Sequence, residues 1–396
     1  MPKISNKGRN IPSSPIRKLV PYSDQAKKKG IDVLHLNIGQ PDIESPIESI
    51  EGIKQNDLKL LKYEYSQGSY EYRTKLSNYY SKHSIDVTPE DIIVTVGASE
   101  ALSFTFSSIC DPGEEIIIPE PFYANYNGFA MASNVKVIPI TSKIQDNFSL
   151  PSISSFEEKI NKNTKAIFLC NPCNPTGYVY SKDEILEIGS LAIKHDIFIV
   201  VDEVYREFIY GNNKHFSILE EKKFYNNAIL IDSSSKRYSL CGARSGCIVS
   251  KNHDFLDACL KFALARLSPP TLGLIAASKA LDSSSDYINN VINEYTIRRN
   301  LLIEELSKID DLVFSNPMGA FYSILKLPLN NSEKFSKFLL TDFSHNGQTV
   351  MLAPAGGFYT SPNLGKDEVR IAFVLNSEKL LKAIKIIGLA LKEYKD

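Results

Sequence analysis

The chain has 396 residues, of which 43% are hydrophobic and 23% charged, a balance typical of a globular protein with about two or three domains. Its 45 basic and 46 acidic residues give a net charge of -1, which argues against a nucleic-acid binder because such proteins need a basic footprint. A polar N-terminus, no long apolar run and six dispersed cysteines predict a cytoplasmic protein with reduced thiols and no membrane contact.

Strand-like apolar runs alternate with helix-length segments through the middle of the chain. The predicted strands are Asp91–Val96, Glu115–Ile118, Lys165–Cys170, Asp196–Val201, Ala228–Ile231 and Gly246–Ser250, and the intervening helices include Ser99–Cys110 and Lys182–His195. This alternation predicts an α/β domain with a mostly parallel sheet, and strands that are apolar throughout are typical of a sheet covered by helices on both faces. We expect residues 46–280 to form this large domain.

A smaller α+β domain is predicted from residues 1–45 and 281–396. After the polar stretch Asp282–Asp286, the expected elements are a long helix through Tyr295–Leu306, a strand near Ala320–Lys326, a helix near Glu333–Phe343, a strand at Glu368–Val374 and a closing helix at Glu378–Tyr394. The N-terminal arm is expected to join this domain.

Several segments with polar or reactive side chains lie just past the end of a predicted strand, which is where ligands bind in open α/β sheets. In Gly97-Ala98-Ser99, small residues join a strand to a helix, whose free N–H groups favour a phosphate. An ordinary tight turn with a serine cap explains the same residues.

The next segment is Asn171-Pro172-Cys173-Asn174-Pro175-Thr176-Gly177, a stiff turn that presents the amide of Asn174 to an oxyanion or a carboxylate. A rigid loop without a ligand is the alternative. Cys170 and Cys173 also have the spacing of a thioredoxin-like redox site, but no thioredoxin-sized domain surrounds them.

Asp202 ends an apolar strand, where a carboxylate is costly unless it has a cationic or hydrogen-bonding partner. A protonated ring nitrogen of a ligand would be such a partner, and Tyr205 could reach the same ligand. A helix cap is the alternative for Asp202.

The loop Asp232-Ser233-Ser234-Ser235-Lys236 and the nearby Arg244 combine an amine with groups that bind anions. Lys236 could form a Schiff base if its surroundings lower its pKa, and Ser233, Ser235 and Arg244 could bind a phosphate. A solvated loop is the alternative.

Arg370 shares a strand face with Ala372 and could bind a carboxylate through both arms of its guanidinium, although an arginine on an edge strand could also lie in water. The chain has no G-x-G-x-x-G, no P-loop and no H-E-x-x-H motif, and its six histidines do not cluster. Neither a dinucleotide site, a nucleoside triphosphate site nor a metal site is therefore expected.

Taken together, these motifs resemble class I aminotransferases of the pyridoxal 5'-phosphate (PLP) fold type I, and within them the bacterial aspartate aminotransferase-like branch. The matching residues are Asn174-Pro175-Thr176-Gly177, Asp202-x-x-Tyr205, Ser233-x-Ser235-Lys236, Arg244 and Arg370. The resemblance runs from about Asn37-Ile38-Gly39-Gln40-Pro41-Asp42 to Arg370, nearly the whole chain. It implies the fold type I arrangement, an aminotransferase activity and a homodimer with shared sites.

The resemblance also implies how the cofactor PLP is held. Lys236 would carry it as a Schiff base and move a proton during catalysis, while Asp202 would keep its ring nitrogen protonated. Asn174 and Tyr205 would bind the ring's 3'-oxygen, and Tyr123 would stack on the ring. The expected phosphate ligands are Ala98, Ser99, Ser233, Ser235, Arg244 and, from the neighbouring subunit, Tyr63 or alternatively Tyr65.

For the substrate, the resemblance implies that Arg370, the backbone of Gly39 and the amide of Asn174 bind the α-carboxylate. An aspartate or glutamate donor, with 2-oxoglutarate as acceptor, needs a second cation for its distal carboxylate, and Arg266 is the candidate from the sequence.

Two departures and three alternatives accompany the resemblance. Gly242-Ala243-Arg244 replaces the commoner Gly-Trp-Arg, and the chain has no tryptophan, so Tyr123 supplies a smaller stacking ring. A PLP-dependent β-lyase or decarboxylase shares all five motifs, and a requirement for a second 2-oxo acid would distinguish it. An aminotransferase for aromatic or neutral amino acids and a non-catalytic PLP-sensing regulator remain open.

Overall fold

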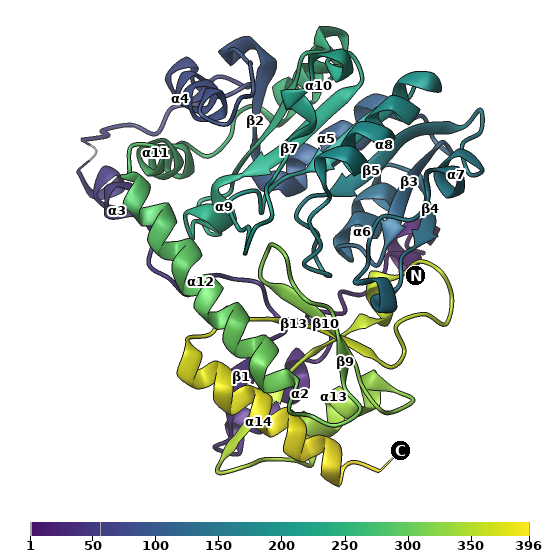
Figure 1. Cartoon of the computed structure of the whole chain (residues 1–396). Helices are drawn as coiled ribbons and strands as arrows, with labels where there is room; N and C mark the ends of the chain where they lie inside the picture. The colour runs from purple at the N-terminus through teal and green to yellow at the C-terminus, as the bar shows by residue number, and fades with distance from the viewer. Residues whose placement is uncertain (1, 56, 396) are drawn as a thin grey trace.

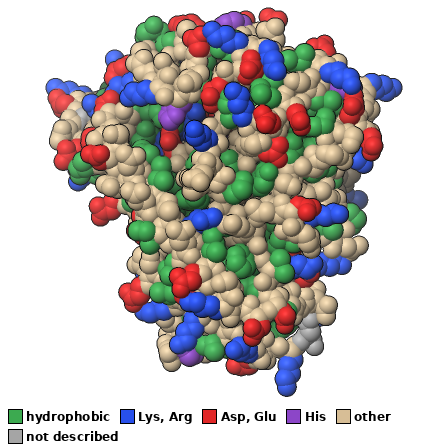
Figure 2. Space-filling view, viewed as in Figure 1, with side chains coloured by type: hydrophobic (Ala, Val, Ile, Leu, Met, Phe, Trp, Pro, Cys, Tyr) green, Lys and Arg blue, Asp and Glu red, His purple; other side chains and the backbone are tan. Residues whose placement is uncertain are grey.

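The computed structural model describes residues 2–55 and 57–395. Figure 1 shows two layered parts, a large one above and a smaller one below, with the long helix α12 (Ser285–Leu306) running from one to the other. Figure 2 shows acidic and basic side chains interspersed over the visible face, without an extended patch of one sign. Within the described ranges, no helix is long and apolar enough to cross a membrane.

The large part is built on a seven-stranded sheet in the order β2-β8-β7-β6-β5-β3-β4. Its strands are β2 (Ile92–Val96), β3 (Glu115–Glu120), β4 (Lys136–Thr141), β5 (Thr164–Cys170), β6 (Phe198–Asp202), β7 (Ala228–Ser233) and β8 (Ser245–Ser250). Strand β8 is antiparallel to both of its neighbours, and the other pairs are parallel. The α/β fold class with a mostly parallel sheet is thereby confirmed.

Helices cover both faces of this sheet, as the apolar strands predict. One face packs against α4 (Tyr70–Ser81), α8 (Lys182–Lys194) and α11 (Thr271–Ala280), and the other against α5 (Gly97–Ile109), α6 (Asn125–Ala132) and α10 (His253–Arg266). Along β6, Ile199 and Val201 face the first layer and Val200 faces the second. Because side chains alternate across a strand, both sets must be apolar when both faces are buried.

Strand β4 was not among the predicted strands. It lies at the edge of the sheet, pairs with β3, and is only partly buried along most of its length. Its run Lys136-Val137-Ile138-Pro139-Ile140-Thr141 contains a proline, which lacks the N–H that a central strand needs. The edge position explains both the proline and the weak sequence signal.

The smaller part combines both ends of the chain. A four-stranded sheet contains β9 (Val313–Phe314), β10 (Tyr322–Lys326), β12 (Ala353–Pro354) and β13 (Glu368–Ala372), and a separate parallel pair joins β1 (Asp32–His35) to β11 (Gln348–Met351). Its helices are α2 (Val20–Lys28), α13 (Ser332–Thr341) and α14 (Ser377–Glu393). The other α-helices of the described residues are α1 (Asn6–Asn10), α3 (Ile47–Lys54), α7 (Ile153–Glu157) and α9 (Ser234–Arg237). The N-terminal arm therefore packs with the C-terminal segment. We propose residues 46–280 and the combination of 1–45 with 281–396 as the two domains.

A buried ion pair supports the loop that follows β7. The guanidinium of Arg237 donates to the carboxylate of Asp232, and both side chains are almost completely buried. The Tyr80 hydroxyl donates to the same carboxylate at 2.9 Å. Since Asp232 and Arg237 flank Lys236, this pair fixes the backbone on both sides of that lysine.

We expect Arg237→Leu to destabilise the fold by about 3–5 kcal/mol, because it leaves the carboxylate of Asp232 buried without its cation. The measurement is the urea dependence of unfolding. Lys308→Ala, which removes an exposed cation paired with Glu304, should leave the midpoint unchanged. Equal midpoints for the two variants would show that the buried pair does not support the fold.

Candidate active site

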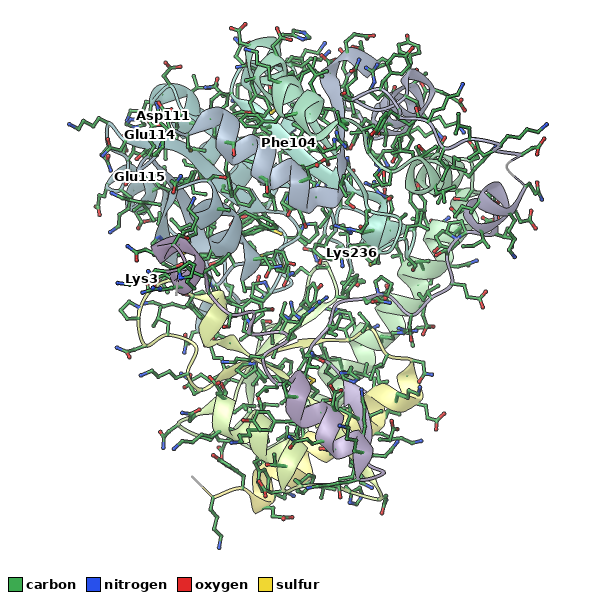
Figure 3. The ribbon with its side chains drawn as sticks, turned by 180° about the vertical axis from the view of Figure 1, so that it is seen from behind. Lys3, Phe104, Asp111, Glu114, Glu115 and Lys236 are labelled. Atoms are coloured by element: carbon green, nitrogen blue, oxygen red, sulfur yellow. The ribbon has the colours of Figure 1, made fainter. Side chains whose placement is uncertain are left out.

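A cavity of about 810 Å³ lies at the carboxyl ends of the large sheet, where they face the smaller part. Figure 3 shows Lys236 at this boundary. The predicted residues that line the cavity are Gly39, Ala98, Ser99, Tyr123, Asn174, Asp202, Tyr205, Ser233, Ser235, Lys236, Arg244 and Arg370. Residues separated by up to about 330 positions in the chain thus surround one space, of a size typical of small-molecule sites.

One end of the cavity offers an anion-binding cradle at the start of α5. The helix begins directly after β2, so the N–H groups of its first turn point out of the helix. A Cβ on Gly97, which has a φ of +70°, would collide with the guanidinium of Arg244. The hydroxyls of Ser233 and Ser235 are hydrogen-bonded to each other at 2.8 Å beside the same space. A helix N-terminus, two hydroxyls and a guanidinium suit a phosphate.

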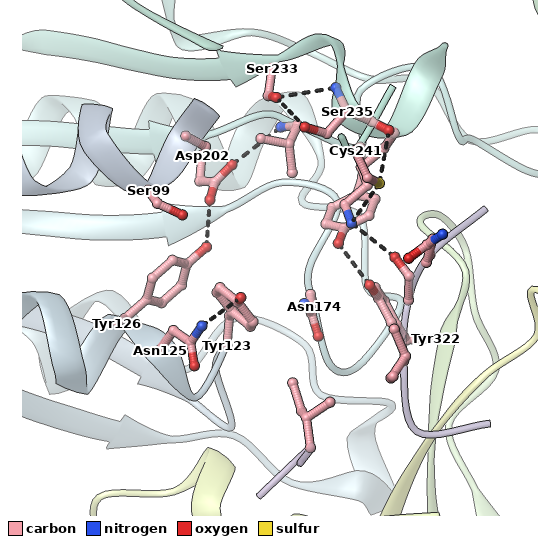
Figure 4. A pocket seen from close by; sticks show the side chains of 18 of the residues that line it. Ser99, Tyr123, Asn125, Tyr126, Asn174, Asp202, Ser233, Ser235, Cys241 and Tyr322 are labelled. Carbon is pink, nitrogen blue, oxygen red and sulfur yellow. Dashed lines mark hydrogen bonds between the residues drawn. The ribbon is translucent and has the colours of Figure 1, made fainter. Parts of the chain in front are cut away.

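Asp202 is the last residue of β6 and is buried among aromatic side chains (Figure 4). The Tyr126 hydroxyl donates to its Oδ2 at 2.7 Å, and the backbone N–H of Val204 donates to its Oδ1 at 3.2 Å. Burial raises the pKa of the Asp202 carboxyl to about 6, although these two hydrogen bonds and the charge of Lys236 lower it. A cation brought next to this carboxylate would restore its ionised form.

The amine of Lys236 projects into the cavity from α9. Its Nζ donates to the backbone oxygen of Gly39 at 2.8 Å and lies 3.9 Å from the Sγ of Cys241. Desolvation is the largest cause of the lowered pKa of Lys236. The charge of Cys241 opposes it, and the weaker effects of the Arg370 and Arg244 charges add to it. A lysine with a lowered pKa is a better nucleophile and base at neutral pH.

Arg370 brings a buried cation to the opposite wall, from the centre of β13. Its NH1 donates to the Asn174 Oδ1 at 3.1 Å, its NH2 donates to the backbone oxygen of Asn37, and its Nε has no partner within the described part of the chain. The guanidinium lies over the rings of Tyr322 and Phe358, 4.5 and 5.0 Å from their centroids. A guanidinium that is 1% exposed and unpaired with any described carboxylate is suited to bind an anionic ligand.

Comparison with known proteins assigns the chain to a family. The sequence profile of the family described as aminotransferase class I and II matches residues 31–387. The chain belongs to this aminotransferase family. An aspartate aminotransferase of Pyrococcus horikoshii is 31% identical over 367 residues, which are 91% of each chain.

Solved structures agree with this assignment. An aspartate aminotransferase from Thermotoga maritima has a TM-score of 0.90 and 28% identity, with 98% of this chain and all of that chain covered (100%). An alanine aminotransferase from Pyrococcus furiosus has the same TM-score and identity, with 99% and 100% covered. The PLP fold type I arrangement and the enzyme class expected from the sequence are therefore confirmed.

Two tyrosines of the aminotransferase cavity were missed by sequence reasoning. Tyr126 bonds to Asp202 as described, and Tyr322 lies with its hydroxyl 2.8 Å from that of Tyr205. Both sit in apolar elements, on α6 and β10, where a tyrosine in the sequence looks like an ordinary core residue. The one related feature of the sequence is Gly39. The Tyr322 hydroxyl lies so close to it that any side chain at position 39 would overlap that hydroxyl.

Three predicted residues do not line the cavity. Tyr63 and the alternative Tyr65 are exposed on the surface, by 79% and 72%. Arg266 instead donates to the Ser66 backbone oxygen at 2.8 Å and lies 3.4 Å from the carboxylate of Glu100. The carboxylate of Glu100 also accepts a hydrogen bond from the backbone N–H of Val96 at 2.8 Å. Arg266 therefore stabilises the start of α5 through Glu100.

The CxxC pair does not have the properties of a redox site. Cys170 and Cys173 are both buried and unpaired, and burial raises the pKa of each thiol. Reactive thiols need the opposite shift, toward the thiolate.

Proposed function

We propose that the chain is a PLP-dependent aminotransferase that moves the α-amino group of aspartate or glutamate to a 2-oxo acid such as 2-oxoglutarate. The observation that carries this proposal is the position of the Lys236 amine, which lies in one cavity between the anion cradle of α5 and the unpaired guanidinium of Arg370. An amino acid and a phosphorylated aldehyde need these three features together.

The cavity residues fit PLP by chemistry and arrangement. The cradle at α5 suits its phosphate, Asp202 suits its ring nitrogen, and Asn174 and Tyr205 suit its 3'-oxygen, with Tyr123 beside the ring. The proposed phosphate ligands of this chain are Ala98, Ser99, Ser233, Ser235 and Arg244. When bound, PLP supplies an electron sink for negative charge at the substrate Cα. The raised pKa of Asp202 has a physical role here, because a protonated ring nitrogen provides the cation that this carboxylate lacks.

The chain's own residues would then bind and orient the substrate. The guanidinium of Arg370, with the amide of Asn174 and the backbone at Gly39, would hold the α-carboxylate. The Lys236 Nζ, already bonded to the Gly39 oxygen, would stand next to the Cα proton and move it. With the carboxylate held by Arg370 and the base supplied by Lys236, the Cα–H bond would be oriented toward the amine, which is the main contribution of positioning to such a reaction.

The substrate class is supported by the relatives and by the charge of the cavity. The P. horikoshii relative is an aspartate aminotransferase, whereas the P. furiosus neighbour is an alanine aminotransferase, so one fold accommodates either type of donor. Among the described residues that line the cavity, the cations are Arg17, Lys236, Arg244 and Arg370, and Asp202 is the carboxylate. Since Lys236, Arg244 and Arg370 would serve PLP and the α-carboxylate common to all amino acids, the remaining cation, Arg17, is the one that favours a dicarboxylic substrate over a neutral one.

A homodimer is proposed from an apolar surface. Large hydrophobic side chains are exposed on α3, on the segment that follows it and on the end of α10, including Ile47 (60%), Leu60 (65%), Leu61 (60%), Tyr63 (79%) and Leu264 (56%). Such a concentration marks an association surface. A second copy would cover it and would bring Tyr63, or Tyr65, to the neighbour's phosphate cradle.

Lys236→Ala should reduce transamination by at least roughly 100- to 10,000-fold, since it removes both the anchor for PLP and the proton-transferring group. The measurements are turnover with aspartate and 2-oxoglutarate and the visible absorption of the lysine–PLP bond, which should disappear. Near-normal turnover in this variant would refute the proposed function. A β-lyase would instead turn over without any 2-oxo acid.

Asp202→Asn should retain PLP but lower kcat by roughly 100- to 1,000-fold, the cost of removing one electrostatic stabiliser of a transition state. Tyr126→Phe is the matched comparison, because it removes one hydrogen bond to Asp202 and keeps the charge, and it should cost less. An unchanged kcat for Asp202→Asn with a normal cofactor spectrum would refute the role of the carboxylate.

Light scattering should give twice the chain mass of 44.3 kDa, and Leu61→Asp should shift the protein toward the monomer with loss of activity. Val313→Asp is the matched control, because Val313 is also exposed (46%) but lies on β9, away from the apolar surface. Fully active monomers at assay concentration would contradict the shared site.

A further inference from the structure

Arg17 is a cation of the cavity that the proposed cofactor and α-carboxylate contacts leave unused. Of the four cations that line the cavity, Lys236 would carry PLP, Arg244 would bind the phosphate and Arg370 would bind the α-carboxylate. Arg17 comes from the N-terminal arm, just before α2, in a segment for which no motif is predicted. Arg17 is therefore in a position to bind a further anionic group.

The side chain of Arg17 is available for a ligand. Within the described residues it makes no hydrogen bond and no ion pair, whereas the other three cations of the cavity each donate to a protein oxygen. The residue is exposed to solvent and also lines the cavity, so it lies at the opening. Burial raises the pKa of the Tyr123 hydroxyl, and the charges of Arg370 and Arg17 both oppose that rise. The two guanidiniums therefore act on one aromatic wall of the cavity.

The backbone that carries Arg17 is held firmly, although its side chain is free. The side chain of Asn37 donates to the backbone oxygen of Ile16 at 2.7 Å, and the backbone oxygen of Asn37 accepts from Arg370. Pro15 packs closely against Gly357: a Cβ added to Gly357 would lie only 2.8 Å from the Cβ of Pro15. The N-terminal arm is thus connected through Asn37 to the α-carboxylate site, which fixes the start of the Arg17 side chain relative to Arg370.

We propose that Arg17 binds the distal carboxylate of a dicarboxylic amino or 2-oxo acid and so determines the donor class. The inference rests on the proposed function, because it assumes that Arg370 binds the α-carboxylate. With one carboxylate on Arg370 and the Cα next to Lys236, the second carboxylate of aspartate or glutamate needs a cation at the cavity wall. Arg17 is free to supply it, whereas Arg266 lies outside the cavity and already bonds to Ser66 and Glu100.

The test compares dicarboxylic with neutral ligands in the holoenzyme. Arg17→Met should lower kcat/KM for aspartate and glutamate by roughly 10- to 100-fold, the value of a charged hydrogen bond, and should change it for alanine by less than about threefold. Arg17→Lys should recover part of the loss. Calorimetric binding of maleate, a cis dicarboxylate, should weaken by a similar factor, and binding of isocrotonate, in which a methyl group replaces one carboxylate of maleate, should not.

Two controls make the result specific. Lys18→Met removes the neighbouring cation, which pairs with Glu333 outside the cavity, and should behave as the wild type with every ligand. Arg370→Ala should instead weaken aspartate and alanine alike. Because Arg17 is at the opening, added salt should raise the KM of the wild type for aspartate, and this dependence should be smaller in Arg17→Met.

The outcomes separate this inference from the proposed function. An active wild type in which Arg17→Met loses aspartate and alanine equally, or loses neither, refutes the role of Arg17 and leaves the aminotransferase intact. A selective loss of aspartate in Arg266→Met, with Arg17→Met unchanged, refutes it in favour of the other arginine. A wild type that transaminates no amino acid refutes the proposed function and this inference with it.

Discussion

The structure around the cavity depends on the buried guanidinium of Arg370. A full positive charge in the protein interior is tolerated because its neighbours supply oxygen acceptors and aromatic faces. Those neighbours come from distant parts of the chain: Asn37 from the N-terminal arm, Asn174 from the turn after β5, and Tyr322 from β10. Satisfying one side chain therefore holds the arm, the large sheet and the smaller sheet together around the same space.

Asp202 is the counterpart of Arg370 on the large sheet. It is a carboxylate whose burial is compensated by two hydrogen bonds and by the charge of Lys236, but by no direct ion pair within the described residues. Arg370 thus lacks an anionic partner, and Asp202 lacks a cationic one in direct contact. A ligand with a carboxylate at one end and a protonated ring at the other would satisfy both, in agreement with the amino acid and pyridine cofactor that we propose for this cavity.

The strands of the large sheet and the residues at their ends could be predicted from local sequence, whereas the residues positioned by contacts between distant segments could not. The strands of the large sheet are apolar runs, and Asn174, Asp202 and Lys236 each follow such a run, so the carboxyl ends of parallel strands bring them together. Tyr126 and Tyr322 could not be distinguished from core residues, because their hydroxyl partners Asp202 and Tyr205 lie far away in sequence. The same holds for Arg17, whose place at the cavity is set by the bond between Asn37 and Ile16. Arg266 shows the opposite error, since a cation near a promising turn is bonded to Ser66 and Glu100 instead of facing the cavity.

The pairing of β1 with β11 has a consequence for how the protein is made. Asp32 lies opposite Gln348 and His35 opposite Met351, so the first strand of the chain pairs with a segment that the ribosome produces more than 300 residues later. Contacts of such long sequence separation form slowly, because the entropy cost of closing a long loop comes before the favourable free energy of the contacts. Until the last tenth or so of the chain has emerged, the arm that carries Arg17 and Asn37 has no strand to join and Arg370 has not been made. The large sheet can assemble during synthesis, whereas the side of the cavity that contains Arg17, Asn37 and Arg370 is completed only after it.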